Sequence, residues 1–191
     1  MTKAREGSDY FGTVDFAVTP NGNDWHPFSA GFHYYPQPQI FGITPKQGPS
    51  VGEGIIHFFG KGFRNDFNLK NLTCQVGEEI GDVEYISDSE VKCKIDNLAL
   101  VPRDSPLEAS VALNGYSWTI PAEENKTRTQ FTPYGIEKIY PNSGPVRADT
   151  TIIIQGKGFQ IVDDDDGVFP RCRFGTPGNY AIVDASIICK K

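Results

Sequence analysis

An internal repeat with a period near 96 residues constrains the fold of this chain more than any other feature. Pro45 and Pro141 open two copies of the motif Pro-x-x-Gly-Pro and lie 96 positions apart (141 − 45). An apolar stretch follows each copy and ends in Gly-x-Gly-Phe, at Phe63 and Phe159, again 96 positions apart (159 − 63). Pro-x-x-Gly-Pro is expected to be a turn, and Gly-x-Gly-Phe a tight bend with an aromatic anchor. Short apolar runs between such turns predict strands, so each repeat is expected to form a β-sandwich module.

Two pairs of cysteines recur at matching places in the two copies. Cys74 and Cys93 lie in the first copy, and Cys172 and Cys189 lie in the second. Four cysteines allow three pairings, and the repeat favours pairing within each copy because each module then carries its own bond. A bond that closes a loop of about 20 residues stabilises a fold by roughly 3 kcal/mol. The alternative is four buried free thiols, which pack as small apolar side chains.

The order of these motifs resembles the signature of IPT/TIG domains, which occur in plexins and some transcription factors. The motifs that carry the resemblance are Pro-x-x-Gly-Pro, a short strand, Gly-x-Gly-Phe, a Cys-x-Val-Gly strand and a later cysteine. The match covers residues 38–133 fully, and residues 134–191 match the first part of a module. The resemblance implies an all-β fold of tandem immunoglobulin-like β-sandwiches, as in fibrocystin-like and plexin-type extracellular arrays, whose modules carry such disulfides.

The N-terminal segment resembles the part of a module that the second copy lacks. In the first copy, an apolar run precedes Asn114-Gly115 and Trp118, and near the N-terminus a similar run precedes Asn21-Gly22 and Trp25. Asn-Gly between β-rich runs predicts a hairpin, because both residues tolerate positive φ. Strands are therefore expected on both sides of each Asn-Gly, including residues 116–120.

Three segments follow from this comparison. Residues 1–37 are expected to be the C-terminal strands of a preceding or neighbouring-chain module, residues 38–133 a complete module, and residues 134–191 the N-terminal part of a further module. Either the chain is an excerpt of a longer array, or residues 1–37 of another chain complete residues 134–191. An incomplete sandwich leaves strand edges unpaired, and a donated hairpin would close them by β-augmentation.

Charge and hydropathy exclude several classes of partner. The formal net charge is −6 and no Lys/Arg cluster occurs beyond Lys190-Lys191, whereas binding to nucleic acid needs a basic face. No apolar run reaches the roughly 18–20 residues that span a bilayer, so no membrane span is expected in this segment. The polar start lacks the apolar core of a signal peptide, which indicates a cytosolic protein, a mature form or a piece of a longer chain.

Candidate sites are few. Two N-glycosylation sequons begin at Asn71 and Asn125 and, together with the cysteines, favour an extracellular or cell-surface location. One acidic run is a weak candidate for calcium and otherwise a solvated loop tip; its residues are Asp163, Asp164, Asp165 and Asp166. No zinc spacing, nucleophile motif or nucleotide-binding loop is present. We therefore expect no enzyme and no cofactor other than possible calcium.

The aromatic residues and the repeat suggest a structural protein. Trp25 and Trp118 are expected to pack in cores, with a sugar-stacking surface as the alternative, and Tyr34-Tyr35-Pro36 is expected to fix the angle between modules. The leading hypothesis is a structural or adhesive extracellular glycoprotein that forms a rod or a head-to-tail fibril by strand complementation. Its partners would be further copies or adjacent modules of the same chain, together with N-linked glycans. The alternative is a set of spacer modules in a large cell-surface receptor that binds a protein or glycan ligand.

Overall fold

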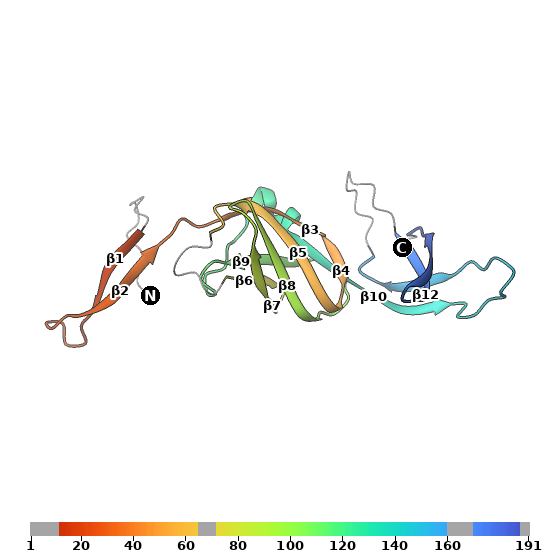
Figure 1. The fold of residues 1–191 in the computed structure, drawn as a ribbon, viewed down its shortest axis with the longest axis horizontal. Helices are drawn as coiled ribbons and strands as arrows, with labels where there is room; N and C mark the ends of the chain where they lie inside the picture. The colour runs from red at the N-terminus through yellow and green to blue at the C-terminus, as the bar shows by residue number, and fades with distance from the viewer. Residues whose placement is uncertain (1–11, 65–71, 160–169, 188–191) are drawn as a thin grey trace.

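The structure, a computed structural model, describes residues 12–64, 72–159 and 170–187 (Figure 1). Within these ranges it is built from β-strands and one short 3-10 helix, which confirms the predicted all-β class. In chain order the elements are β1 (Gly12–Val18), β2 (His26–Tyr34), β3 (Gln39–Thr44), β4 (Gln47–Pro49), β5 (Val51–Lys61), β6 (Thr73–Val76), β7 (Glu79–Tyr85), β8 (Glu90–Ala99), β9 (Leu107–Ala112), η1 (Glu123–Thr129), β10 (Gln130–Tyr140), β11 (Ile153–Lys157), β12 (Arg171–Thr176) and β13 (Asn179–Asp184).

The strands of residues 38–133, here called the complete module, form a sandwich along one hydrogen-bonded path. Their order is β10-β9-β6-β7-β8-β5-β3, and β4 pairs in parallel with β10. Strand β7 belongs to both sides of the sandwich, because residues 79–82 pair with β6 and residues 82–85 pair with β8. The path therefore folds over at β7, and its two sides enclose one core.

The core draws side chains from both sides of this sandwich. It includes Ile56 and Phe58 of β5, Val91 of β8, Val111 of β9 and Phe131 of β10. Buried and less buried residues alternate along residues 54–60 of β5, as expected for a strand with one face on a core. Since burying one such side chain fully contributes roughly 1.5–3 kcal/mol, this cluster is the main stabilising element of the complete module.

The Pro-x-x-Gly-Pro motif differs in part from the predicted turn. Its first proline follows a cis peptide bond at Thr44–Pro45, but Gly48 and Pro49 belong to strand β4 and pair with β10. A Cβ atom on Gly48 would lie 2.8 Å from the ring of Phe131. The glycine is therefore required because it makes room for a core phenylalanine.

The Gly-x-Gly-Phe motif bends at its second glycine, two residues after the first. Gly60 remains inside β5, where a Cβ atom would collide with the carbonyl oxygen of Gln39 on β3. Gly62 makes the bend with a φ of 81°, a value that glycine adopts without steric cost. Phe63 is then buried in the core, which confirms the predicted aromatic anchor.

The strand predicted at residues 116–120 is wrong. Apart from a single bridge between Ala112 and Trp118, residues 116–122 are not in a strand, and η1 follows them. The Asn114-Gly115 turn forms as predicted, but its second arm does not continue as a strand. The partner that completes this side of the sandwich is β10, which begins at Gln130 and pairs with β9.

Residues 134–187, here called the partial module, repeat the first strands of the complete module. Gly135 pairs with Lys157 as Gln39 pairs with Lys61, 96 positions earlier on both strands. The register shift that follows also occurs at the same place, and Tyr140–Pro141 is cis like Thr44–Pro45. Strands β12 and β13 take the place of β6 and β7, but their hairpin has a different register: Cys172 pairs with Val183, whereas Cys74 pairs with Gly81.

One strand crosses the boundary between these two modules. Residues 130–134 of β10 pair with β9 and β4 of the complete module, and residues 135–140 pair with β11 of the partial module. The hairpin of β1 and β2 lies on the far side of the complete module from the partial module (Figure 1). Nowhere in the described ranges does a helix have the length and apolar character needed to cross a membrane.

Candidate functional site: two open apolar faces

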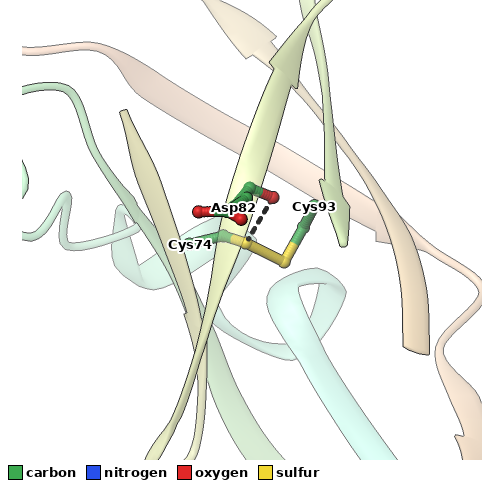
Figure 2. The surroundings of a disulfide bond; sticks show 3 residues. All are labelled: Cys74, Asp82 and Cys93. Atoms are coloured by element: carbon green, nitrogen blue, oxygen red, sulfur yellow. Dashed lines mark hydrogen bonds between the residues drawn. A yellow bond between two sulfur atoms is a disulfide. The ribbon is translucent and has the colours of Figure 1, made fainter. Parts of the chain in front are cut away.

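A disulfide joins the two sides of the complete module (Figure 2). Cys74 on β6 and Cys93 on β8 are fully buried, and their sulfur atoms lie 2.04 Å apart. The bond passes Asp82 of β7, the residue at which that strand changes sides, and the Cys74 sulfur lies 3.5 Å from the Asp82 carbonyl oxygen. A disulfide sulfur carries no proton, so this approach is a packing contact. The structure thus contains the pairing that the repeat predicts for the first copy.

The second predicted disulfide stays a prediction. Cys172 lies on β12, is the counterpart of Cys74 and is half-buried. It bonds to no cysteine within the described ranges. Its predicted partner, Cys189, lies outside the described residues.

The other predicted site residues are only partly described. Asn71 and the acidic run of Asp163, Asp164, Asp165 and Asp166 lie outside the described residues. Asn125 lies in η1 and is half-buried. Among the residues that the structure describes, no three His, Cys, Asp or Glu side chains gather in a group that could hold a metal ion.

Charged side chains form exposed pairs on the outer face of the complete module. The ammonium group of Lys92 donates a hydrogen bond of 2.8 Å to Glu84, and this bond lowers the pKa of Glu84 from its ordinary value. Lys94 pairs with Asp96 at 2.9 Å, which raises the pKa of Lys94. Exposed ion pairs of this kind contribute little to stability, so they mark a solvated face.

The N-terminal hairpin, formed by β1 and β2, repeats the local structure that surrounds β9. The side-chain oxygen of Asn21 accepts hydrogen bonds from the backbone N–H groups two and three positions further on, at 3.1 and 3.0 Å. Asn114 does the same at 3.0 and 2.7 Å. The following glycines, Gly22 and Gly115, both have positive φ, of 80° and 75°. These two turns are 93 positions apart (114 − 21), so β1 corresponds to β9.

Strand pairing supports the same correspondence. Val14 pairs with Phe32 in the N-terminal hairpin, and Leu107 pairs with Phe131 in the complete module. At the offset of 93, Val14 is the counterpart of Leu107, which makes Phe32 the counterpart of Phe131. The N-terminal hairpin therefore has the strand order, turn and pairing of β9 and the start of β10.

The N-terminal hairpin exposes the side chains that its counterparts bury. Phe32 is 51% exposed, whereas Phe131 is 2% exposed. Trp25 is 66% exposed and Trp118 is half-buried, so the prediction that both tryptophans pack in cores is wrong for this structure. The large apolar side chains exposed on the hairpin are Phe16, Val18, Trp25, Phe28 and Phe32. We call this set the hairpin face.

The partial module is open in the same way. Ile136 is 58% exposed, although its counterpart Ile40 is 1% exposed, and Phe174 on β12 is 46% exposed, whereas Val76 on β6 is fully buried. We call the apolar positions of β10, β11 and β12 that correspond to core residues the open face: Ile136, Ile139, Ile154, Cys172 and Phe174. In the complete module, β9 and β10 cover the corresponding positions. The described residues after 140 contain no counterpart of those two strands.

The counterpart of strand β4 also lacks its partner strand in the partial module. Residues 143–145 correspond to β4 at the offset of 96, but they form no strand. Strand β4 exists in the complete module because β10 pairs with it. The counterpart of β10 in that pairing is β2 of the N-terminal hairpin, which lies on the far side of the molecule.

The junction between the complete and partial modules is held by specific contacts. The backbone N–H of Gly158 donates a hydrogen bond of 3.0 Å to the carboxylate of Asp104, 54 positions earlier in the chain. The rings of Tyr134 and Phe159 stack with centroids 5.8 Å apart. A Cβ atom on Gly158 would collide with the carbonyl oxygen of Pro133, so the glycine permits close contact. Sequence reasoning missed the Asp104 contact, because no local pattern links residues so far apart.

The junction before the complete module is built differently. Phe32 and its counterpart Phe131 are 99 positions apart (131 − 32), but Gln39 and its counterpart Gly135 are 96 positions apart (135 − 39). The junction before the complete module is therefore three residues longer than the junction after it. It contains Pro36 and Pro38 and lies in no strand. Tyr35 packs against the core of the complete module, and burial raises the pKa of its phenol.

Comparison with known proteins agrees with this architecture. The IPT/TIG domain family matches the chain twice, at residues 38–131 and 133–190. The chain belongs to the IPT/TIG domain family. TIG domains are immunoglobulin-like modules and are not an enzyme family.

One relative is a large protein. The chain is similar to human Fibrocystin-L, with 24% identity over 160 residues. The aligned region covers 82% of this chain and 4% of Fibrocystin-L. The chain thus spans a small fraction of the length of that relative.

Proposed function

We propose that this chain is a structural segment of an extracellular TIG array, without catalytic activity of its own, that assembles head to tail into a filament. The observation that carries the proposal is the match between the hairpin face and the open face. Phe16, Val18 and Phe32 of the hairpin face, and the residues of the open face, have counterparts that are buried in the complete module. Together the two parts supply counterparts of β3, β5, β6, β7, β9 and β10, and the described residues contain no counterpart of β8. A contact between different surfaces of identical chains is heterologous, and it extends into a filament when it does not close into a ring.

Three observations support an extracellular or cell-surface location. The Cys74–Cys93 disulfide is of a kind that persists in oxidising compartments. The relative Fibrocystin-L shares the TIG modules of this chain. The sequons that begin at Asn71 and Asn125 are acceptor sites for N-linked glycans, which proteins receive in the secretory route.

A second candidate is a spacer role within a large cell-surface receptor. The contacts of the Asp104–Gly158 junction favour it, because a fixed junction holds neighbouring modules at a set angle. The small share of Fibrocystin-L that the chain covers also fits an array with many further modules. In that case the next segment of the same chain would cover the open face, and a different domain would bind the ligand.

Electron microscopy of the unreduced protein tests the proposal. Filaments with a repeat near two module lengths are the expected result, and short isolated rods would contradict it. Deleting residues 1–36 should abolish filaments, because the deletion removes the hairpin face and leaves the open face uncovered. A matched control replaces Asp15, an exposed polar residue of β1, with Asn, which retains the hairpin face and the hydrogen bonds of the Asn21 turn.

A further inference from the structure

We propose that the N-terminal hairpin of a second copy completes the partial module in one defined register, with β1 beside β12 and Val18 opposite Cys172. This inference rests on the proposed function and adds the residues that meet. The occupant is a second copy of this chain, because the chain itself carries a hairpin with the strands and turn that the open face lacks.

The register follows from the complete module. There β9 pairs with β6, and Val111 lies opposite Cys74 while Ser110 lies opposite Gln75. The offset from β1 to β9 is 93, fixed by the Asn21 and Asn114 turns, and the offset from β6 to β12 is 98, fixed by Cys74 and Cys172. Applying both offsets places Val18 opposite Cys172, Ala17 opposite Arg173 and Phe16 opposite Phe174.

Strand β2 has a place in the same arrangement. In the complete module, Thr132 and Pro133 of β10 pair with Gln47 and Gly48 of β4. The counterparts of the two β10 residues are His33 and Tyr34, and the counterparts of the two β4 residues are Ser143 and Gly144. Residues 143–145 would then become a strand, as β4 is in the complete module.

A retained glycine supports this placement. Gly48 has no side chain where the ring of Phe131 packs, since a Cβ atom would lie 2.8 Å from that ring. The partial module keeps a glycine at the corresponding position, Gly144, although it contains no phenylalanine corresponding to Phe131 among its described residues. In the single chain the side chain of Thr150 lies there, with its hydroxyl oxygen 2.5 Å from the position of a Cβ atom on Gly144. Thr150 would therefore have to move for Phe32 of the second copy to pack against Gly144.

The completed polymer would alternate two kinds of TIG module. One is the complete module of a single chain, and the other combines the partial module of one chain with the N-terminal hairpin of the next. Two junctions would alternate as well. One is the continuous strand β10, and the other is the segment at residues 35–38, which is three residues longer.

Disulfide cross-linking between two single variants tests the register. Ala17→Cys and Arg173→Cys proteins are prepared separately, mixed and oxidised mildly, and covalent dimers are measured on non-reducing gels. Both positions lie on the outward side of their strands and would be directly opposite, within the 4.4–6.8 Å between Cα atoms that a disulfide spans. The dimer should form in the mixture, and peptide mass spectrometry should locate the bond between positions 17 and 173.

The matched control pairs Ala17→Cys with Arg171→Cys. This variant also replaces an exposed arginine of β12, but two residues away on the same side, about 7 Å along the strand. Its dimer yield should be at least tenfold lower. Each variant should keep the melting temperature of the parent protein, because all three positions are away from the core.

The outcomes separate the register from the filament itself. A dimer specific to the 17–173 pair supports the register, whether or not long filaments form. Filaments seen by electron microscopy with equal or no cross-linking in both pairs would overturn the register and leave the filament standing. Absence of both filaments and cross-links would overturn the two together.

Discussion

Replacing Phe32 and Phe131 with alanine, one at a time, should separate assembly from the stability of the complete module. The two residues are counterparts in sequence and pairing but differ in burial, at 51% and 2% exposed. Phe131→Ala removes a ring from a closed core, and such substitutions cost about 3–5 kcal/mol. Phe32→Ala removes a ring that is half in solvent when the chain is alone.

The size of the assembly effect follows from the same exposures. If a second copy covers Phe32 as fully as Phe131 is covered, assembly buries about half of its side chain. Fully burying a phenylalanine contributes roughly 1.5–3 kcal/mol, so the loss per contact is about 1 kcal/mol, or about fivefold in the association constant. A cavity left at the contact would add to this loss.

Two assays measure the two effects. Urea unfolding followed by circular dichroism should show a lower midpoint for Phe131→Ala and an unchanged main transition for Phe32→Ala. Sedimentation at a series of concentrations should show that Phe32→Ala raises the critical concentration for assembly about fivefold. The reasoning fails if Phe32→Ala lowers the unfolding midpoint as much as Phe131→Ala does, or if it leaves assembly unchanged.

Two further predictions concern the complete module and its junction. Replacing Cys74 and Cys93 together with alanine should lower the free energy of unfolding by about 3 kcal/mol, because the bond closes a loop with a sequence separation of 19. Denaturant unfolding measures this loss. A reductant should have no further effect on the unfolding transition of the variant. Asp104→Ala should speed amide hydrogen exchange at Gly158 at least tenfold, since a hydrogen bond to a carboxylate contributes about 1.5–3 kcal/mol. An unchanged rate, or an equal acceleration in the exposed control Asp149→Ala, would show that the bond does not fix the junction.

The sequence predicts most of the repeated architecture, because the repeated residues are fixed by local requirements. Phe63 is an aromatic anchor, and Cys74 and Cys93 lie on separate strands where the repeat placed them. The hairpin at Asn21-Gly22 also forms as predicted, since an asparagine side chain that caps its own turn needs no distant partner.

The errors concern features that depend on distant strands. Asn114-Gly115 makes its turn, but the residues after it form no strand because β10 takes the place beside β9. Pro49 belongs to β4 because β10 pairs with that strand, and the motif itself does not indicate this pairing. Trp25 was expected in a core, but the strands that would enclose it are absent from its own surroundings. Local patterns specify turns and faces, whereas pairing partners follow from the whole sandwich.

The parallel pairing of β4 with β10 determines how the complete module would respond to stretching. The chain enters the module near β3 and β4 and leaves it along β10, so tension at the two ends pulls β4 and β10 in opposite directions along their length. The hydrogen bonds between them are then loaded together in shear, where several must break at once before the strands separate. Since β10 continues directly into pairing with β11, the same strand passes the load to the next module. The complete module is thereby arranged to resist extension, and the segment at residues 35–38, which lies in no strand, is the place that would lengthen first.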